Sequence, residues 1–163
     1  RSQTVTGVQT CALPIFWKPF AEEMAEMDAF DELADEVRGP TRSYRKRLLE
    51  RGDVGMWVGT SGDAYVGLAT GEHRASPPVF ARGDAGHVHE IYVVPAERGS
   101  GLADRLLDYV SSWALDRGCT HLSLDVNVAN DRARAFYLDR GFEVKRERLV
   151  RPLRSGLEDR QPD

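Results

Sequence analysis

One segment of this sequence has the residue types and spacing of a ligand-binding turn. An apolar run ends at Pro95, a turn carries Gly99 and Gly101, and a helical pattern follows. Glycine lets the backbone approach a ligand closely, and the free amides at the start of a helix bind phosphate. The turn is not a Walker motif, because no Gly-Lys-Ser/Thr follows, and Asp104 replaces the third glycine of a dinucleotide fingerprint. The segment predicts a site for a pyrophosphate-bearing ligand, with a plain strand-to-helix turn as the alternative.

Three side chains that can accept protons precede this turn. His87 and His89 are two residues apart, so an unbulged strand places them on one face and Glu90 on the opposite face. Histidine has an ordinary pKa of ~6.5, which suits proton transfer near neutral pH. We expect one of the three to act as a general base, although a polar strand end gives the same pattern, and a bulge would change the faces. No third ligand accompanies the two histidines, so we expect no metal site.

Two motifs in register resemble the GNAT N-acetyltransferase superfamily. Residues 98–103 fit its Arg/Gln-x-x-Gly-x-Gly/Ala signature. Residues 124–142 carry an Asn, an Ala, a Tyr and a terminal Gly-Phe at the family's spacings. The resemblance is clear over residues 86–145, extends less clearly back to residue 41, and is weak before residue 40.

This resemblance implies an acetyl-CoA-dependent N-acetyltransferase that transfers an acetyl group to a primary amine by direct attack. It implies that the backbones of Ile91 and Val93 meet the acetyl group and pantetheine, and that Tyr137 protonates the leaving thiolate. Core packing beside Phe136 is the alternative for Tyr137. The other residues implied in cofactor binding are Arg98, Gly99, Ser100, Gly101, Leu102, Ala103, Asn130, Ala133, Phe136 and, again, Tyr137. A non-catalytic acyl-CoA-binding sensor or interaction module with the same fold is the alternative function.

The elements that must position these residues alternate in type. Apolar periodicity predicts helices and strands, with a hairpin turn at residues 60–63 and a long loop over residues 71–86. The expected helices span residues 20–38, 41–49, 101–117 and 130–139, and the strands span residues 54–59, 64–69, 87–94, 122–128 and 142–150. Their order predicts an α/β or α+β mixed sheet flanked by helices. The resemblance adds a pantetheine groove between two splayed strands.

The first residues differ in character from the rest. Residues 1–15 resemble a translated sequencing-library adapter, and such scars are excluded from the reasoning about the fold. A genuine edge strand is the alternative for this segment. We expect a single N-acetyltransferase domain over residues 16–153 and a polar tail over residues 154–163.

Composition narrows the function classes. The chain has 163 residues, 22 Lys and Arg against 26 Asp and Glu, and a formal charge of −4. This length suits one domain, and the acidic balance gives no electrostatic case for nucleic acid or an anionic membrane. Only two cysteines are present, so a reducing cytoplasm is the expected compartment. The expected partners are acetyl-CoA and an amine acceptor, and a homodimer is left open.

Overall fold

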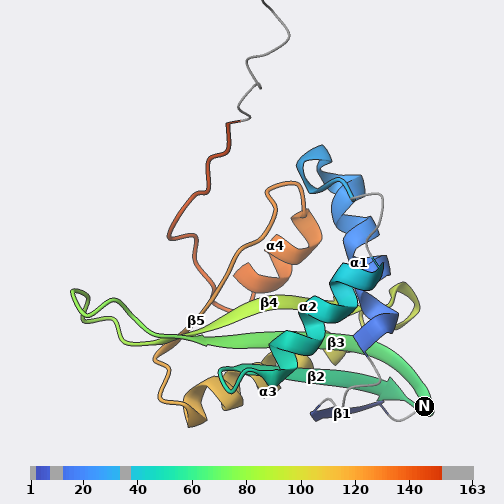
Figure 1. Ribbon diagram of the computed structural model, residues 1–163, viewed down its shortest axis with the longest axis horizontal. Coiled ribbons are helices and arrows are strands. Elements are labelled where there is room, and N and C mark those ends of the chain that lie inside the picture. Colours follow the sequence, from blue (N-terminus) through green and yellow to red (C-terminus); the bar gives the residue numbers. More distant parts are fainter. Residues whose placement is uncertain (1–2, 8–12, 34–37, 152–163) are drawn as a thin grey trace, which may run out of the picture. The chain divides into compact units, whose positions relative to one another are not determined.

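The computed structural model describes residues 3–7, 13–33 and 38–151, which fall in two compact units, residues 1–130 and 131–163. The first unit contains a five-stranded sheet in the order β1-β2-β3-β4-β5 (Figure 1). The strands are β1 (Gln3–Gly7), β2 (Val54–Ser61), β3 (Ala64–Arg74), β4 (Ala85–Val93) and β5 (His121–Leu124). The first four pair antiparallel, whereas β4 and β5 pair parallel and are joined through α3 (Leu102–Asp116). The predicted mixed sheet is confirmed.

Helix α3 covers one face of the sheet. Its residues Leu102, Leu106 and Val110 are almost fully buried. A Cβ at Gly86 of β4 would lie 2.6 Å from the Cβ of Ala114, so the strand needs glycine there for the helix to approach. This contact places the end of α3 beside the start of β4.

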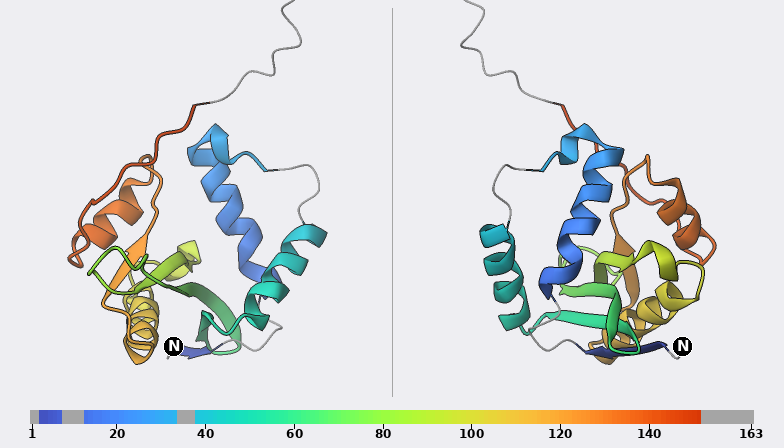
Figure 2. Two further views of the ribbon diagram at one scale, coloured as in Figure 1. Left: turned by 60° about the vertical axis from the view of Figure 1, so that its left-hand side comes forward. Right: turned by 90° about the vertical axis from the view of Figure 1, so that its right-hand side faces the viewer.

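Helices α1 (Leu13–Met27) and α2 (Arg38–Glu50) cover the other face (Figure 2). Phe16 of α1 lies in a buried cluster with Val58, Leu68 and Tyr92. Leu48 of α2 packs on Met56 of β2 in a second cluster. The sheet is therefore the middle of three layers.

The boundaries of the first two helices differ from the prediction. Helix α1 ends at Met27, where Asp28 accepts a hydrogen bond from the Phe30 amide and caps a short 3-10 helix, η1 (Ala29–Asp31). Gly39 and Pro40, predicted to end a helix, lie in the first turn of α2 instead. Proline is accepted there because the first amides of a helix have no intrahelical acceptor.

Three further predictions about the sheet were wrong. Residues 72–74 of the predicted loop belong to β3, because they pair with residues 85–87 of β4. Strand β5 ends at Leu124 rather than residue 128, and Val128 is exposed. Residues 142–150 form no strand, and all but Phe142 are exposed. Five of the eight residues 143–150 are charged, so the segment has little apolar surface to bury against a sheet.

The second unit contains α4 (Asp131–Leu138). Gly141 follows in the left-handed conformation, and the Phe142 amide donates to the Tyr137 carbonyl. This helix has the predicted place in the sequence and carries Ala133, Phe136 and Tyr137.

Candidate active site

The turn before α3 has the backbone that its glycines predict. A short 3-10 helix, η2 (Pro95–Glu97), leads into Gly99 and Gly101, which both have φ +78°. Gly101 is the N-cap of α3, and the first amides of a helix have no intrahelical acceptor. A Cβ at Gly99 would meet nothing within 4 Å. The amides of this turn are therefore presented on an accessible surface where the helix dipole favours an anion.

Strand β4 leaves its neighbour β5 halfway along its length. The two strands pair only from Ala85 with His121 to Val88 with Leu124, while β4 stays paired with β3 up to Val93. The Val94 amide donates to the Val66 carbonyl of β3. Successive residues of an antiparallel strand direct their amides and carbonyls to alternate sides, so those of Val93 and Ile91 point away from β3, to the edge that β5 leaves unpaired. The predicted splay is present, with these two backbones along it.

Arg98 lies at the end of this open edge. Its Nε donates to the Val93 carbonyl at 2.9 Å, and its Nη2 donates to Glu23 of α1. Its guanidinium carbon lies 5.7 Å from the centre of the Tyr92 ring. The arginine of the motif thus links the glycine turn to the strand edge.

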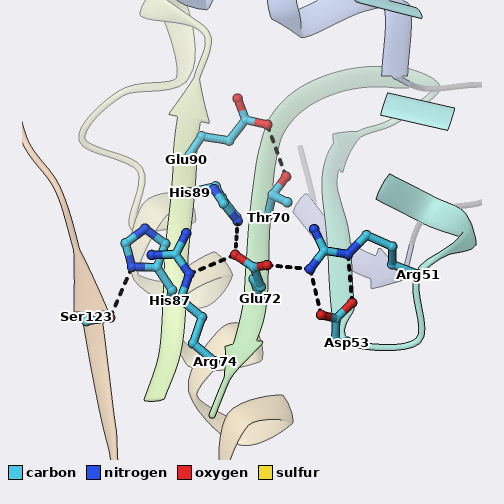
Figure 3. A network of polar contacts seen from close by, with 9 residues as sticks. All are labelled: Arg51, Asp53, Thr70, Glu72, Arg74, His87, His89, Glu90 and Ser123. Atoms are coloured by element: carbon cyan, nitrogen blue, oxygen red, sulfur yellow. Dashed lines mark hydrogen bonds and ion pairs between the residues drawn. The ribbon is translucent and has the colours of Figure 1, made fainter. Parts of the chain in front are cut away.

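A bulge reorders the three candidate bases on β4. Thr70 pairs with Glu90 and Gly71 pairs with Val88, so His89 is the extra residue. The bulge brings Glu90 to the same face as His87, which corrects the prediction that they lie on opposite faces. All three side chains lie on that face, and each has its own polar partner there: Ser123 for His87, Glu72 for His89 and Thr70 for Glu90 (Figure 3).

His87 is the buried member of the pair. Its Nδ1 lies 3.0 Å from Ser123 Oγ of β5, and its ring centre lies 5.1 Å from that of His89. Burial, together with the positive charge of Arg74 and the nearby His89, lowers the pKa of His87 to about 4. The ring is therefore neutral at physiological pH.

His89 is more exposed and contacts Glu72 of β3. Its Nε2 lies 2.9 Å from Glu72 Oε2. The same carboxylate accepts hydrogen bonds from Arg74 and Arg51, and Arg51 also donates to Asp53. Burial alone would raise the pKa of Glu72, but the two arginines outweigh it and lower the pKa to about 2. Glu72 is ionised throughout the working range of pH.

Glu90 is buried and fully engaged. Its two oxygens accept from Arg45 of α2 at 2.6 and 2.9 Å, and Oε1 also accepts from Thr70 at 3.0 Å. This bidentate pair ties α2 to the middle of β4. Three hydrogen bonds, two of them from a guanidinium, hold this carboxylate in a fixed position.

Tyr137 lies among aromatic rings of the second unit. Its ring centre is 5.1 Å from that of Phe136 and 5.3 Å from that of Phe142. Burial raises the pKa of Tyr137 to about 12, so the phenol keeps its proton at neutral pH.

Residues 16–142 match the sequence profile of the Acetyltransferase (GNAT) family. The chain belongs to the GNAT family. It is 32% identical over 96 residues to an uncharacterized N-acetyltransferase of Archaeoglobus fulgidus. The aligned region covers 59% of this chain and 65% of that protein. The chain spans about half the length of two other curated relatives.

Solved structures share the fold of this GNAT-family chain at low sequence identity. A tetramutant of the BH1408 protein from Bacillus halodurans has a TM-score of 0.81 and 14% identity, covering 92% of this chain and 99% of that one. A predicted acetyltransferase of Clostridium acetobutylicum, solved with acetyl-CoA, has a TM-score of 0.71 and 17% identity, covering 93% of this chain and 96% of that one. These likenesses confirm the GNAT-like fold.

The sequence did not predict the side chains that contact the three candidate bases, which are Glu72, Ser123 and Arg45. Glu72 was assigned to a loop, and neither Ser123 nor Arg45 was singled out. A signal was present, because Thr70, Glu72 and Arg74 are polar at a spacing of two residues, which continues the alternation of β3. Their contacts depend on strand pairing and could not be read from that spacing.

The N-terminal strand of this GNAT-family chain also contacts the glycine turn. Gln3 of β1 donates to Glu97 at 2.6 Å and to Ser100 at 3.0 Å, and its carbonyl oxygen accepts from Arg105 of α3. Gln3 lies within the segment that resembles an adapter.

Two features are absent from the part of the chain that the structure describes. Within residues 3–7, 13–33 and 38–151, no three His, Cys, Asp or Glu side chains are grouped to hold a metal ion. In the same part of the chain, no helix is long and apolar enough to cross a bilayer.

Proposed function

We propose that this chain transfers the acetyl group of acetyl-CoA to a primary amine of a small molecule or protein. The observation that carries the proposal is the divergence of β4 from β5 directly before a glycine turn at a helix start. An unpaired strand edge accepts an extended amide-bearing chain such as pantetheine, and the turn suits its pyrophosphate.

The proposed cofactor contacts follow the open edge. The backbones of Ile91 and Val93 meet the acetyl group and pantetheine, and the amides of residues 99–103 hold the pyrophosphate. Arg98 lies beside them and supplies positive charge. Asn130, Ala133, Phe136 and Tyr137 complete the set on the cofactor arm.

The proposed reaction is one direct displacement. The amine nitrogen attacks the thioester carbonyl, a C–N bond forms, the C–S bond breaks, and CoA leaves as a thiolate that takes a proton. We assign the removal of the amine proton to the His87–His89 pair, because Glu90 is already held by Arg45 and Thr70. Tyr137 supplies the proton to the thiolate, which its raised pKa permits because the phenol stays protonated.

The extent and setting of the enzyme are part of the proposal. The acetyltransferase domain spans residues 16–153, followed by a polar tail over residues 154–163. The low cysteine content favours the cytoplasm. The acceptor is an uncharged amine at the moment of attack, whatever its class.

Calorimetric titration of the full chain with acetyl-CoA and desulfo-CoA tests the cofactor site. We expect micromolar binding of both, followed by release of free thiol from acetyl-CoA when a panel of primary amines is added. The Tyr137→Phe variant should bind acetyl-CoA normally and turn over about 10²-fold more slowly, since a general acid contributes at least that factor. A folded protein that binds neither compound contradicts the proposal. Binding without turnover of any amine favours the sensor alternative.

A further inference from the structure

The Glu72–His89 pair lies on the sheet face that also carries His87 and Glu90 (Figure 3). Glu72 lies outside residues 98–103 and 124–142, which carry the two family motifs, and it has no role in the proposed reaction. Its carboxylate is held from both sides, by Arg51 through Oε1 and by Arg74 through Oε2 at 2.8 Å. The carboxylate therefore has a fixed position rather than the freedom of a surface glutamate.

We propose that Glu72 is a positioning residue that fixes the tautomer of His89, so that His89 Nδ1 takes the proton of the attacking amine. This inference rests on the proposed acetyl transfer. An ionised carboxylate can only accept hydrogen bonds. With His89 Nε2 at 2.9 Å from Glu72 Oε2, the neutral ring must carry its hydrogen on Nε2, which leaves the lone pair on Nδ1.

The same contact stabilises the product of proton transfer. When the amine N–H bond breaks, its proton goes to His89 Nδ1 and the electron pair stays on the nitrogen that bonds to the acetyl carbon. His89 is then a cation with its Nε2–H directed at the carboxylate, and a charge-assisted hydrogen bond is stronger than a neutral one. Arg51 and Arg74 keep the carboxylate in place while the charge changes.

Nitrogen NMR on the uniformly labelled full chain tests the tautomer directly. The signals of His89 are assigned by their loss in His89→Gln, because the chain has only four histidines. In spectra of the neutral ring we expect a protonated Nε2 and an unprotonated Nδ1 in the parent protein. Glu72→Gln should produce a mixture of tautomers, since a side-chain amide both donates and accepts.

The matched control is Asp53→Asn. It removes a carboxylate that also binds Arg51 but leaves the Glu72–His89 contact in place, so the His89 signals should stay as in the parent. A parent His89 protonated on Nδ1, or a tautomer unchanged by Glu72→Gln, overturns the inference.

A kinetic measurement links the tautomer to the reaction. With acetyl-CoA and an amine that the parent acetylates, Glu72→Gln should lower kcat about 10-fold and leave the KM for acetyl-CoA unchanged, because the protonated His89 loses its charge-assisted hydrogen bond as well as its fixed tautomer. An unchanged kcat overturns the inference. Failure of the parent to bind acetyl-CoA contradicts the proposed function instead, and the NMR result still decides the tautomer.

Discussion

Two neighbouring histidines of β4 have different surroundings and therefore different properties. His87 is buried against Ser123, whereas His89 is the exposed residue of a bulge and faces a fixed carboxylate. The bulge also brings Glu90 onto their face, where Arg45 neutralises it. At the scale of single residues, one irregular position in β4 thus determines which groups are available for proton transfer.

Burial of His87 predicts a pH-dependent stability. Its pKa is about 4 in the folded protein and about 6.5 in an unfolded chain. Between these values the unfolded state binds a proton that the folded state does not, so the free energy of unfolding falls as the pH is lowered. At pH 5 the loss is about 2 kcal/mol relative to pH 8.

Urea denaturation at pH 8 and pH 5 measures this loss. His87→Gln should lose about 2 kcal/mol less than the parent between the two pH values, whereas His121→Gln, which removes an exposed histidine of β5, should behave like the parent. An equal loss of stability between pH 8 and pH 5 in the parent and in His87→Gln would contradict the lowered pKa of His87.

Helix α3 has a left-handed glycine at each end, but the two ends have different proposed roles. Gly101 precedes the helix with φ +78°, and Gly118 follows it with φ +76°. The first presents amides to the open edge of β4, while the second only ends the helix. At the scale of elements, the proposed cofactor site is the junction of one strand end and one helix start.

This pair of glycines gives a matched test. Gly101→Ala and Gly118→Ala should each lose about 1–2 kcal/mol of stability, because alanine is strained at positive φ. Only Gly101→Ala should weaken acetyl-CoA binding, by on the order of 10-fold, since the added methyl group keeps the pyrophosphate from one turn amide and one hydrogen bond to a charged group contributes about 1.5 kcal/mol. Thermal melts and calorimetric titration measure the two effects. Equal affinities of the two variants for acetyl-CoA would show that the pyrophosphate does not bind at the Gly101 turn.

At the scale of the whole molecule, the proposed chemistry draws on residues of both units. The histidines and the glycine turn belong to residues 1–130, and Tyr137 belongs to residues 131–163. The N-terminal strand β1 pairs with β2, although its sequence resembles an adapter. Val5 is its one buried side chain among the described residues, whereas Phe16, where the family match begins, lies in the core.

Deletion of residues 1–15 tests the proposed start of the domain. Loss of the buried Val5 side chain lowers the free energy of unfolding by about 2 kcal/mol, and the cluster around Phe16 remains. We expect the shortened chain to unfold cooperatively in urea, about 2 kcal/mol less stable than the parent, and to bind acetyl-CoA. The Val5→Ala variant of the full chain is the control for the lost side chain. A shortened chain that does not fold would show that the domain needs a strand before residue 16.

Local residue patterns predicted the order of the elements from α1 to α4, the glycine turn and the family, but neither β1 nor the absence of a strand over residues 142–150. Local signals suffice for these features, because periodicity, proline and paired glycines constrain the backbone within a few residues. Helix α3 and the hairpin of β2 and β3 appear within a few residues of the predicted bounds, although β3 runs further. The predicted strand over residues 142–150 was wrong, because alternation of apolar and polar residues does not show whether a partner strand is present.

The arrangement of the candidate bases depends on strand pairing and could not be predicted from residue spacing. The bulge at His89 depends on how β3 and β4 register with each other, and the contacts of Glu72, Ser123 and Arg45 join residues 17 to 45 positions apart. The register of a sheet is fixed by many packing contacts at once, so a shift of one residue changes every face. For that reason the sequence predicted candidate residues for proton transfer, and the fold determined which of them have a partner.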